Sequence, residues 1–444
     1  MRSGKESETM SSAIEKASSG LLTPALSRAI GEQLGDPAWL AALRQRAAEA
    51  AEALPMPSTM ERPWKYLDVS RLDLDPYTPA VAATARLSAD EARQKYGVGT
   101  TAALLVQHNS ETIVTEPGAG LAVTDFAAAG EEQRRVIEKH LASGVPAARN
   151  RFTALHYAFL RGGVLVDVPA NSEVAAPVRI VRDLEQGGQF AAPHTLIVTG
   201  ANSRVNVVED YRSGEGEILA APAVEIIAGP ASEVTYTALH RWGPATRVFG
   251  EQRALPGRDA AIVGVSVAAG GRVVKAHLES SLAERGSSSE LFGLVLGDAQ
   301  QQFDFYTVQD HIGPDTRSDL LFKSALKGSS RSAYYGVTRV GLGARNADAN
   351  QENRNLLLSK KARAESDPVL EILTNDVIRA SHGATAGPVS EEQLFYLQAR
   401  AIPRPQAEAL LVRGFLGQVL DRIRDEALRD DLAAVIDTKL GATS

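Results

Sequence analysis

The histidines are the side chains in this sequence most able to do chemistry. The chain contains no cysteine, which removes thiolate catalysis, disulfides and cysteine metal ligands from consideration. No two histidines stand two, three or four residues apart, so no local metal motif such as HExxH exists. A metal site would therefore need isolated histidines, carboxylates or sulfur from another chain. The eight histidines are His108, His140, His156, His194, His240, His277, His311 and His382.

Among these, His382 lies in the segment "NDVIRASHGATAGP", residues 375–388, among small neighbours that leave its ring accessible. A neutral imidazole nitrogen is a good ligand for borderline metals. The residues alone leave two interpretations open. One is a histidine held by hydrogen bonds in a loop, which the local chemistry favours, and the other is a metal ligand.

The segment "DHIGPDTRSD", residues 310–319, gathers a histidine, acids and hydroxyls. Its Gly-Pro pair favours a plain turn between strands over a ligand site. Asp304 and Glu371 lie in strand-like segments, and we expect both to face outward, since a buried carboxylate is costly.

Motifs for nucleotide and acyl chemistry are missing. No G-x-x-x-x-G-K-[ST] occurs, so we expect no ATP hydrolysis by this chain. No G-x-S-x-G nucleophile elbow occurs either. The segment "GLGARNAD" from Gly341 lacks the last glycine of a dinucleotide-binding loop and is interpreted as a turn.

The composition is that of a water-soluble globular protein. Apolar residues make up 44% of 444 residues, and charged residues 23%. A net charge of -7 disfavours nucleic-acid binding. No apolar run approaches the ~20 residues of a membrane span, and the first twenty residues lack the apolar core of a signal peptide. We therefore expect a cytoplasmic protein that binds no membrane.

The pattern along the chain predicts a mainly β protein with helical ends. Residues 25–54 are rich in helix formers and are interrupted at Asp36-Pro37, where Asp36 is expected to cap the second helix. The predicted regions are an N-terminal helical region (1–85), a mixed connecting region (86–150), a β core (151–387) and a C-terminal helical region (388–444).

The β core carries near-repeating corners. "ANSEV" at Ala170, "ANSRV" at Ala201 and "ASEV" at Ala231 recur about every thirty residues between short runs of alternating Val and Ile. Asn and Ser favour such bends because their side chains bond to nearby backbone. The pattern predicts a stacked-coil β-helix, and a β-sandwich is the alternative.

The C-terminal region is predicted to be two or three amphipathic helices. Ser390 is the expected N-cap of the first helix, and the last helix is expected over about 426–440. An apolar stripe packs either on the β core or on another protein. Its residues are Leu410, Leu411, Phe415, Leu416, Val419, Leu420 and Ile423.

Several segments of this sequence resemble those of a known protein family. "SHGATAGPVSEEQLFYLQARAI", from Ser381 to Ile402, is similar to the signature of the SufB/SufD family of the Suf iron–sulfur cluster assembly system. The segments "RPWKYLDVSRL" (62–72), "AHLESSLAERGSSSEL" (276–291), "HIGPDTRSD" (from His311) and "NQENRNLLLSKKARAESDPVLEI" (350–372) agree with it. The resemblance implies a right-handed parallel β-helix core flanked by helical N- and C-terminal regions.

The family divides at the histidine. The SufB branch carries His-Glu there and an assembly cysteine earlier in the chain, whereas the SufD branch carries His-Gly. His382-Gly383 and the absence of cysteine resemble the SufD branch. Two residues depart from the family pattern. Ala380 stands where a cysteine is frequent, and Ala401 stands where glycine is common, so the turn at 399–402 is expected to differ slightly.

The resemblance implies a non-catalytic scaffold subunit. It would pair with SufB through the β-helix and carry the SufC ATPase on its C-terminal helices. A nascent Fe–S cluster would form transiently at the SufB–SufD interface, with His382 as a cluster or metal ligand. Sulfur would arrive through SufB from a SufS-type cysteine desulfurase and its transfer partner. The isolated chain would hold no cofactor stably. The residues expected to contact SufC are Phe395, Leu411, Phe415, Leu416 and Val419.

Two other functions remain open. A β-helix polysaccharide lyase or hydrolase would usually carry an export signal and a groove of acids, arginines or aromatics, but aromatic residues make up only 5% here. Alternatively, the chain is a plain structural partner of an ATPase to which His382 contributes nothing.

Overall fold

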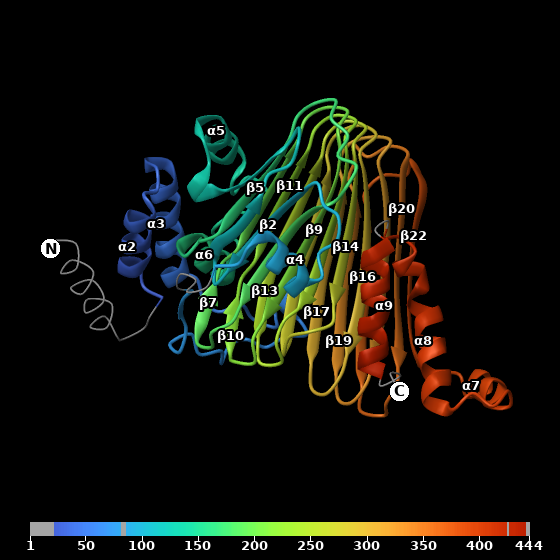
Figure 1. Ribbon diagram of the computed structural model, residues 1–444. Coiled ribbons are helices and arrows are strands. Elements are labelled where there is room, and N and C mark those ends of the chain that lie inside the picture. The colour runs from blue at the N-terminus through green and yellow to red at the C-terminus, as the bar shows by residue number, and fades with distance from the viewer. Residues whose placement is uncertain (1–21, 81–85, 424–425, 441–444) are drawn as a thin grey trace.

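A computed structural model describes residues 22–80, 86–423 and 426–440. The chain is mainly β and forms a solenoid of about eight turns with helices at both ends (Figure 1). From β13 onward, successive strands alternate between two sheets, and strands of neighbouring coils pair in parallel. This confirms the predicted β-helix. The β-sandwich alternative is wrong, because parallel pairing between successive coils builds both sheets.

The first sheet, called sheet A, has its strands in the spatial order β21-β19-β17-β15-β13-β11-β8-β5-β4. Its strands are β4 (Ala122–Asp125), β5 (Gly163–Val168), β8 (His194–Thr199), β11 (Ala223–Ala228), β13 (Arg247–Pro256), β15 (Val273–Leu282), β17 (Gln302–His311), β19 (Arg331–Val340) and β21 (Arg363–Ile372), with β1 (Thr78–Pro79), β7 (Gln189–Ala191) and β10 (Ile218–Ala220) beside them.

The second sheet, called sheet B, has the order β22-β20-β18-β16-β14-β12-β9-β6-β2-β3. Its strands are β2 (Ala103–His108), β3 (Glu111–Glu116), β6 (Val178–Leu184), β9 (Arg204–Ser213), β12 (Glu233–Arg241), β14 (Ala261–Ala268), β16 (Ser288–Gly297), β18 (Arg317–Leu326), β20 (Ala347–Leu357) and β22 (Val377–Pro388). β2 and β3 from the expected connecting region extend sheet B, and β4 extends sheet A. This part of the chain therefore begins the solenoid, while the division into four regions stays a prediction.

The corners form as the sequence predicts. Asn171, Asn202 and Ala231 have φ values of 60°, 55° and 54°, the left-handed conformation that closes a tight bend. Asn is among the few non-glycine residues that adopt it readily. The Asn202 side-chain amide also donates to Asn171 Oδ1 at 3.3 Å, so equivalent corners of neighbouring coils are joined.

Side chains alternate between the two faces of each strand, and those that point inward fill the space between the sheets. Phe303 and Phe305 on β17 lie in the apolar interior, with 0% and 1% exposure. Asp304 between them faces outward, as expected, yet only 2% of it is exposed. Its Oδ1 accepts a hydrogen bond from Lys275 Nζ at 2.7 Å. The expectation that an outward carboxylate meets water is therefore wrong at this position.

A segment that precedes the solenoid causes this burial. The 3-10 helix η1 (Arg62–Trp64) places Trp64 over the outer face of sheet A, 5.5 Å from Lys275 Nζ. Trp64 stacks on Phe152, with ring centroids 5.4 Å apart. Glu371 at the far end of this face stays partly exposed, and its Oε1 lies 2.8 Å from Arg62 Nη1.

The N-terminal helices cover the first strands of sheet A. Asp36 does not cap the second helix, because Pro37 occupies the N-cap. Its Oδ2 instead accepts from Arg44 Nε at 2.8 Å, since the buried guanidinium needs a counter-charge. The helices of this half are α2 (Pro24–Leu34), α3 (Ala38–Ala53), α4 (Ala89–Tyr96), α5 (Glu131–His140) and α6 (Arg151–Ala158), with the 3-10 helix η2 (Phe126–Ala128).

The C-terminal helices are α7 (Glu391–Gln398), α8 (Arg404–Leu420) and α9 (Glu426–Leu440). Ser390 Oγ accepts from the Gln393 backbone N–H at 3.3 Å, which confirms the predicted cap. α8 and α9 pack on the outer face of sheet B, and α7 projects away from it (Figure 1). The turn between α7 and α8 uses Ala401 with φ 63°, a conformation that glycine adopts more easily. None of the helices built by the described residues has both the length and the hydropathy needed to cross a bilayer.

Candidate functional site

His382 lies on β22, the last strand of sheet B, and not in a loop. The loop interpretation is therefore wrong, because residues 377–388 pair with β20 along its length. The imidazole is exposed to solvent. Strand backbone fixes the direction of the side chain more firmly than a loop would, so the ring is presented from a rigid element.

The register of the last coils sets which way His382 faces. His382 pairs with Gln351 on β20, and Gln351 pairs with Leu320 on β18. Both partners are fully buried in the row that faces the other sheet. Side chains stack in the same direction in parallel, in-register strands, so His382 continues this row. The coil ends there, and His382 is the exposed last member of an otherwise interior row.

Both strands of the last coil are edge strands. β21 ends sheet A and β22 ends sheet B among the described strands. Large apolar side chains are exposed on this coil, with Ile372 at 42%, Leu373 at 58% and Ile378 at 71%. Free strand edges beside exposed apolar residues favour pairing with another chain. The last coil, defined here as residues 363–388, is therefore the candidate site.

The neighbours of His382 hold β22 in place. Ser381, on the opposite side of the strand, donates to Asn350 Oδ1 at 2.8 Å, and Asn350 Nδ2 donates to Asp319 Oδ1 at 3.0 Å. These two hydrogen bonds join three coils and fix the register of β22 beside the imidazole. Gly383 has open space around it, because a Cβ there would have no heavy atom within 4 Å. The fold therefore does not require glycine after His382.

The expected SufC contacts fall into three groups by burial. Leu416 and Val419 are 0% exposed and pack in the cluster between α8, α9 and sheet B. Leu411 and Phe415 are partly buried. A docked protein could reach the buried pair only if α8 moved. Phe395 on α7 is 73% exposed, so it is the member of the set that is most accessible to a partner.

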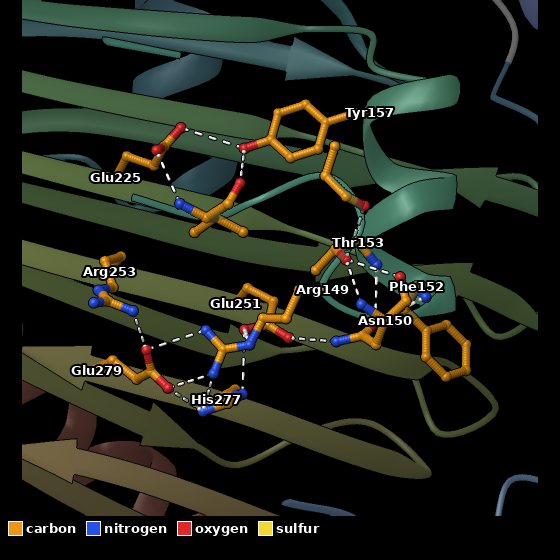
Figure 2. Close-up of polar contacts among 12 residues, drawn as sticks. Arg149, Asn150, Phe152, Thr153, Tyr157, Glu225, Glu251, Arg253, His277 and Glu279 are labelled. Carbon is orange, nitrogen blue, oxygen red and sulfur yellow. Dashed lines mark hydrogen bonds and ion pairs between the residues drawn. The ribbon is translucent and has the colours of Figure 1, made fainter. Parts of the chain in front are cut away.

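A polar cluster on the outer face of sheet A was missed by the sequence reasoning (Figure 2). Three glutamates, Glu225, Glu251 and Glu279, lie on successive strands β11, β13 and β15 and hold the connector 141–150 between α5 and α6. Glu225 Oε1 accepts from the backbone N–H of Val145 at 3.1 Å. Glu251 Oε1 accepts from the Asn150 side-chain amide at 2.9 Å, the residue that caps α6. The available signal was glutamate recurring at the length of one coil.

His277 is the centre of this cluster. Its Nε2 lies 2.7 Å from Glu279 Oε1 and 2.8 Å from Arg149 Nη2, and its Nδ1 lies 3.3 Å from Glu251 Oε2. Burial by itself would raise the pKa of Glu279, but hydrogen bonds from His277 and Arg149 outweigh it and lower that pKa far below its usual range. All three glutamates accept hydrogen bonds from the connector, so the cluster fixes the connector to the solenoid.

Two histidines far apart in the sequence meet beside this cluster. His156 Nε2 lies 3.0 Å from His194 Nδ1, and His156 Nδ1 lies 2.7 Å from the Ala221 carbonyl oxygen. His194 Nε2 lies 3.2 Å from Glu225 Oε2. Burial lowers the pKa of His156, so its ring is neutral. Residues 38 positions apart could not be paired from the sequence, since only the packing of α6 against sheet A brings His156 to His194 on β8.

The segment around His311 is a turn, as the sequence predicts. His311 is 0% exposed, and its ring nitrogens lie 2.9 Å from Thr316 Oγ1 and 2.8 Å from Ser318 Oγ. Burial lowers the pKa of His311 to about 4. Within residues 22–80, 86–423 and 426–440, no group of three or more His, Asp or Glu side chains is arranged to hold a metal ion.

The family model and the individual proteins that this chain resembles are all described as iron–sulfur cluster assembly proteins. Residues 182–415 match the family model described as SUF system FeS cluster assembly, SufBD core domain. The chain is 30% identical over 429 residues to the iron–sulfur cluster assembly protein SufD of Bacillus subtilis, covering 93% of this chain and 97% of that protein. An iron–sulfur cluster assembly SufBD family protein of Mycobacterium bovis is 33% identical over 307 residues, covering 68% of this chain and 76% of the relative. One of Staphylococcus haemolyticus is 28% identical over 420 residues, covering 89% and 88%.

Proposed function

Since this chain belongs to the SufBD family of iron–sulfur cluster assembly proteins, we propose that it acts as a SufD-type scaffold subunit and not as an enzyme. The observation that carries this proposal is the position of His382. It is the exposed end of an interior row on a coil with two free edges. A single exposed imidazole does not complete a metal site within this chain, but a second chain can reach it.

The last coil is the proposed contact with SufB. Edge strands present unpaired backbone N–H and C=O groups, and a second β-helix can satisfy them by strand addition. Ile372, Leu373 and Ile378 would supply the apolar area of the interface. Pairing of this kind would bring the inward row that ends at His382 up against the other subunit. We place this complex in the cytoplasm.

The nascent Fe–S cluster is the cargo of the proposed complex. His382 offers one imidazole, which is too little for a stable iron site by itself. The remaining ligands, including a thiolate, would come from SufB, because this chain contains no cysteine. Sulfur would reach the site through SufB from a SufS-type desulfurase and its transfer partner. Ala380 carries no donor atom, so the family's frequent cysteine at that position has no counterpart here.

The proposed SufC surface lies on α7 and the start of α8. Phe395 is 73% exposed and Tyr396 54%, both on the projecting helix α7, and Leu410 on α8 is 49% exposed. Leu416 and Val419 would act indirectly, by anchoring α8 to sheet B. ATP hydrolysis would belong to SufC, since this sequence has no phosphate-binding loop of the G-x-x-x-x-G-K-[ST] type.

The experiment that tests this function is co-purification of Ile378→Lys with SufB and SufC. Lys on this edge strand would place a charge in the apolar interface, so SufB is expected to be lost while SufC, bound at α7, is retained. The control is Ile312→Lys, at a position that is 46% exposed in the turn between β17 and β18, two coils before the free edges. Normal recovery of SufB with Ile378→Lys would overturn the proposed interface.

A further inference from the structure

A cavity of about 300 Å³ lies between the N-terminal helices and the first coil of the solenoid. Apolar side chains from three helical segments form part of its wall: Trp39 from α3, Phe126 from η2 and Ile137 from α5. Its volume is at the lower end of the range typical of small-molecule sites. The cavity is at the end of the solenoid opposite β22, so it is separate from the proposed cluster site (Figure 1).

The carboxylates that line this cavity are already engaged. Asp36 Oδ2 accepts from Arg44 Nε at 2.8 Å. Asp125 Oδ1 accepts from the Ala127 backbone N–H at 2.9 Å, and its Oδ2 accepts from the Gln107 side-chain amide at 3.2 Å and from the Thr112 hydroxyl. Glu111 also has a partner in the chain. The cavity therefore offers few free acceptors to a cationic ligand.

Two arginines in the wall have guanidinium N–H groups with no acceptor among the described residues. Arg161 is half-buried, and its only hydrogen bond with the described residues runs from Nη1 to the Ala80 carbonyl oxygen at 3.2 Å. Burial lowers the pKa of Arg161, and the charges of Glu111 and Asp125 offset this only in part. Arg134 on α5 is exposed, and its side chain makes no hydrogen bond or ion pair with the described parts of the chain.

A desolvated guanidinium without a carboxylate partner gains strongly from an anion, because charge-assisted hydrogen bonds to oxyanions are short and strong. Trp39 and Phe126 offer aromatic surface beside these donors, and Ser110 and Thr112 also line the wall. Cations and aromatic faces around one cavity suit a ligand with an oxyanion at one end and an apolar group at the other.

We propose that this cavity binds a small aromatic or apolar oxyanion, with its carboxylate or phosphate between Arg134 and Arg161 and its apolar part against Trp39 and Phe126. The proposal concerns a different end of the molecule from His382 and does not depend on cluster assembly. It gives the N-terminal helical region a ligand-binding role beyond covering the solenoid.

Trp39 provides a direct reporter. The chain has three tryptophans, of which Trp64 and Trp242 are only 5% and 3% exposed, whereas Trp39 is half-buried at the cavity wall. The full chain would be titrated with phenyl phosphate and with benzoate while tryptophan fluorescence and heat of binding are followed. Benzyl alcohol, inorganic phosphate and acetate are the probes that lack one half of the proposed ligand.

Saturable binding of at least one aromatic anion, tighter than any of the three partial probes, is the expected result. A preference for phenyl phosphate would assign a phosphate ligand, and a preference for benzoate a carboxylate. Arg161→Gln and the exposed Arg134→Gln should each weaken binding about tenfold or more, the loss expected for one charge-assisted contact. Arg135→Gln is the control, because Arg135 is the next residue on α5 and pairs on the surface with Glu131.

Equal binding of benzyl alcohol and the aromatic anions would overturn the proposal, and so would the absence of saturable binding. Unchanged affinity in Arg134→Gln, which alters no side-chain hydrogen bond among the described residues, would remove that residue from the site and contradict the two-arginine arrangement. If Arg161→Gln failed to fold, the Arg134→Gln result would still decide the matter.

Discussion

His382 on β22 pairs in register with Gln351 on β20, and the two differ completely in burial. Gln351 is 0% exposed, and its amide accepts from Thr338 Oγ1 at 2.9 Å and donates to the Gly336 carbonyl oxygen at 3.2 Å. The row is apolar at Leu291 and Leu320, becomes polar at Gln351 and ends with the exposed imidazole of His382. The buried interior therefore closes one coil before the solenoid ends, and His382 is left free for contact with another molecule.

Gly383 is expected to tolerate a side chain. A Cβ there meets nothing within 4 Å, so Gly383→Ala should change the free energy of unfolding by less than about 0.5 kcal/mol. The matched control is Gly293→Ala on β16, where a Cβ would lie 2.1 Å from a ring carbon of Phe322. Overpacking there should cost about 1–3 kcal/mol. Chemical denaturation of both variants tests the contrast, and a large loss at Gly383 would contradict the open geometry.

The two halves of the expected SufC surface should respond differently to mutation. Phe395→Ser should leave the stability nearly unchanged and reduce SufC binding, because the ring is 73% exposed. Leu416→Ala should cost about 2–5 kcal/mol of stability, since it opens a cavity under α8. Thermal unfolding and SufC co-purification would be measured for both.

Truncation after Gly387 would also remove SufC binding, but it would uncover the apolar face of sheet B that α8 and α9 protect. The point variants are therefore the cleaner test. Full SufC binding by Phe395→Ser would exclude this ring from the contact.

Lowering the pH from 7 to 5 should reduce the free energy of unfolding, because the His311 side chain is buried. Burial lowers its folded pKa from 6.5 to about 4, so the unfolded chain takes up the proton first as the pH falls. The stability from this group is complete above pH 6.5 and is lost as the pH falls from 6.5 towards 4. The loss should reach about 2 kcal/mol at pH 5. In His311→Asn the free energy of unfolding should depend less steeply on pH between 7 and 5, and an unchanged slope would contradict this assignment.

The buried pair of Lys275 and Asp304 gives a test of packing. Lys275→Met leaves the Asp304 carboxylate without its cation, at 2% exposure, and should cost about 3–5 kcal/mol. Adding Asp304→Leu should recover most of the loss, because both charges are then gone. Denaturation of the single and double variants measures this, and additive losses would show that the pair does not act as a unit.

Local sequence was enough to predict the coils. The Asn and Ser corners carry their own conformational preference, so Asn171 and Asn202 showed the repeat without knowledge of the fold. The N-cap of α7 and the bounds of α9 are equally local. The last coil was harder, because the strand character of "RASHGATAG" is weak and comes from pairing with β20.

Burial and long-range contacts could not be predicted in the same way. Asp304 faces outward as its alternation requires, but the covering Trp64 lies 240 residues earlier in the chain. The contact of His156 with His194 depends on how α6 packs against β8. Leu416 and Phe395 both looked like candidate contacts, and only the packing of α8 on sheet B separated the buried residue from the exposed one.

The most direct test of the account is anaerobic Fe–S cluster formation by the complex of this chain with SufB and SufC, comparing wild type with His382→Ala. Thr385→Ala is the control, since Thr385 is exposed on the same strand but on its opposite face. We predict an intact complex in both variants and a loss of cluster formation of about tenfold or more in His382→Ala alone. Unchanged cluster formation in His382→Ala would contradict the role of His382, and dissociation of the complex would show that the residue serves pairing instead.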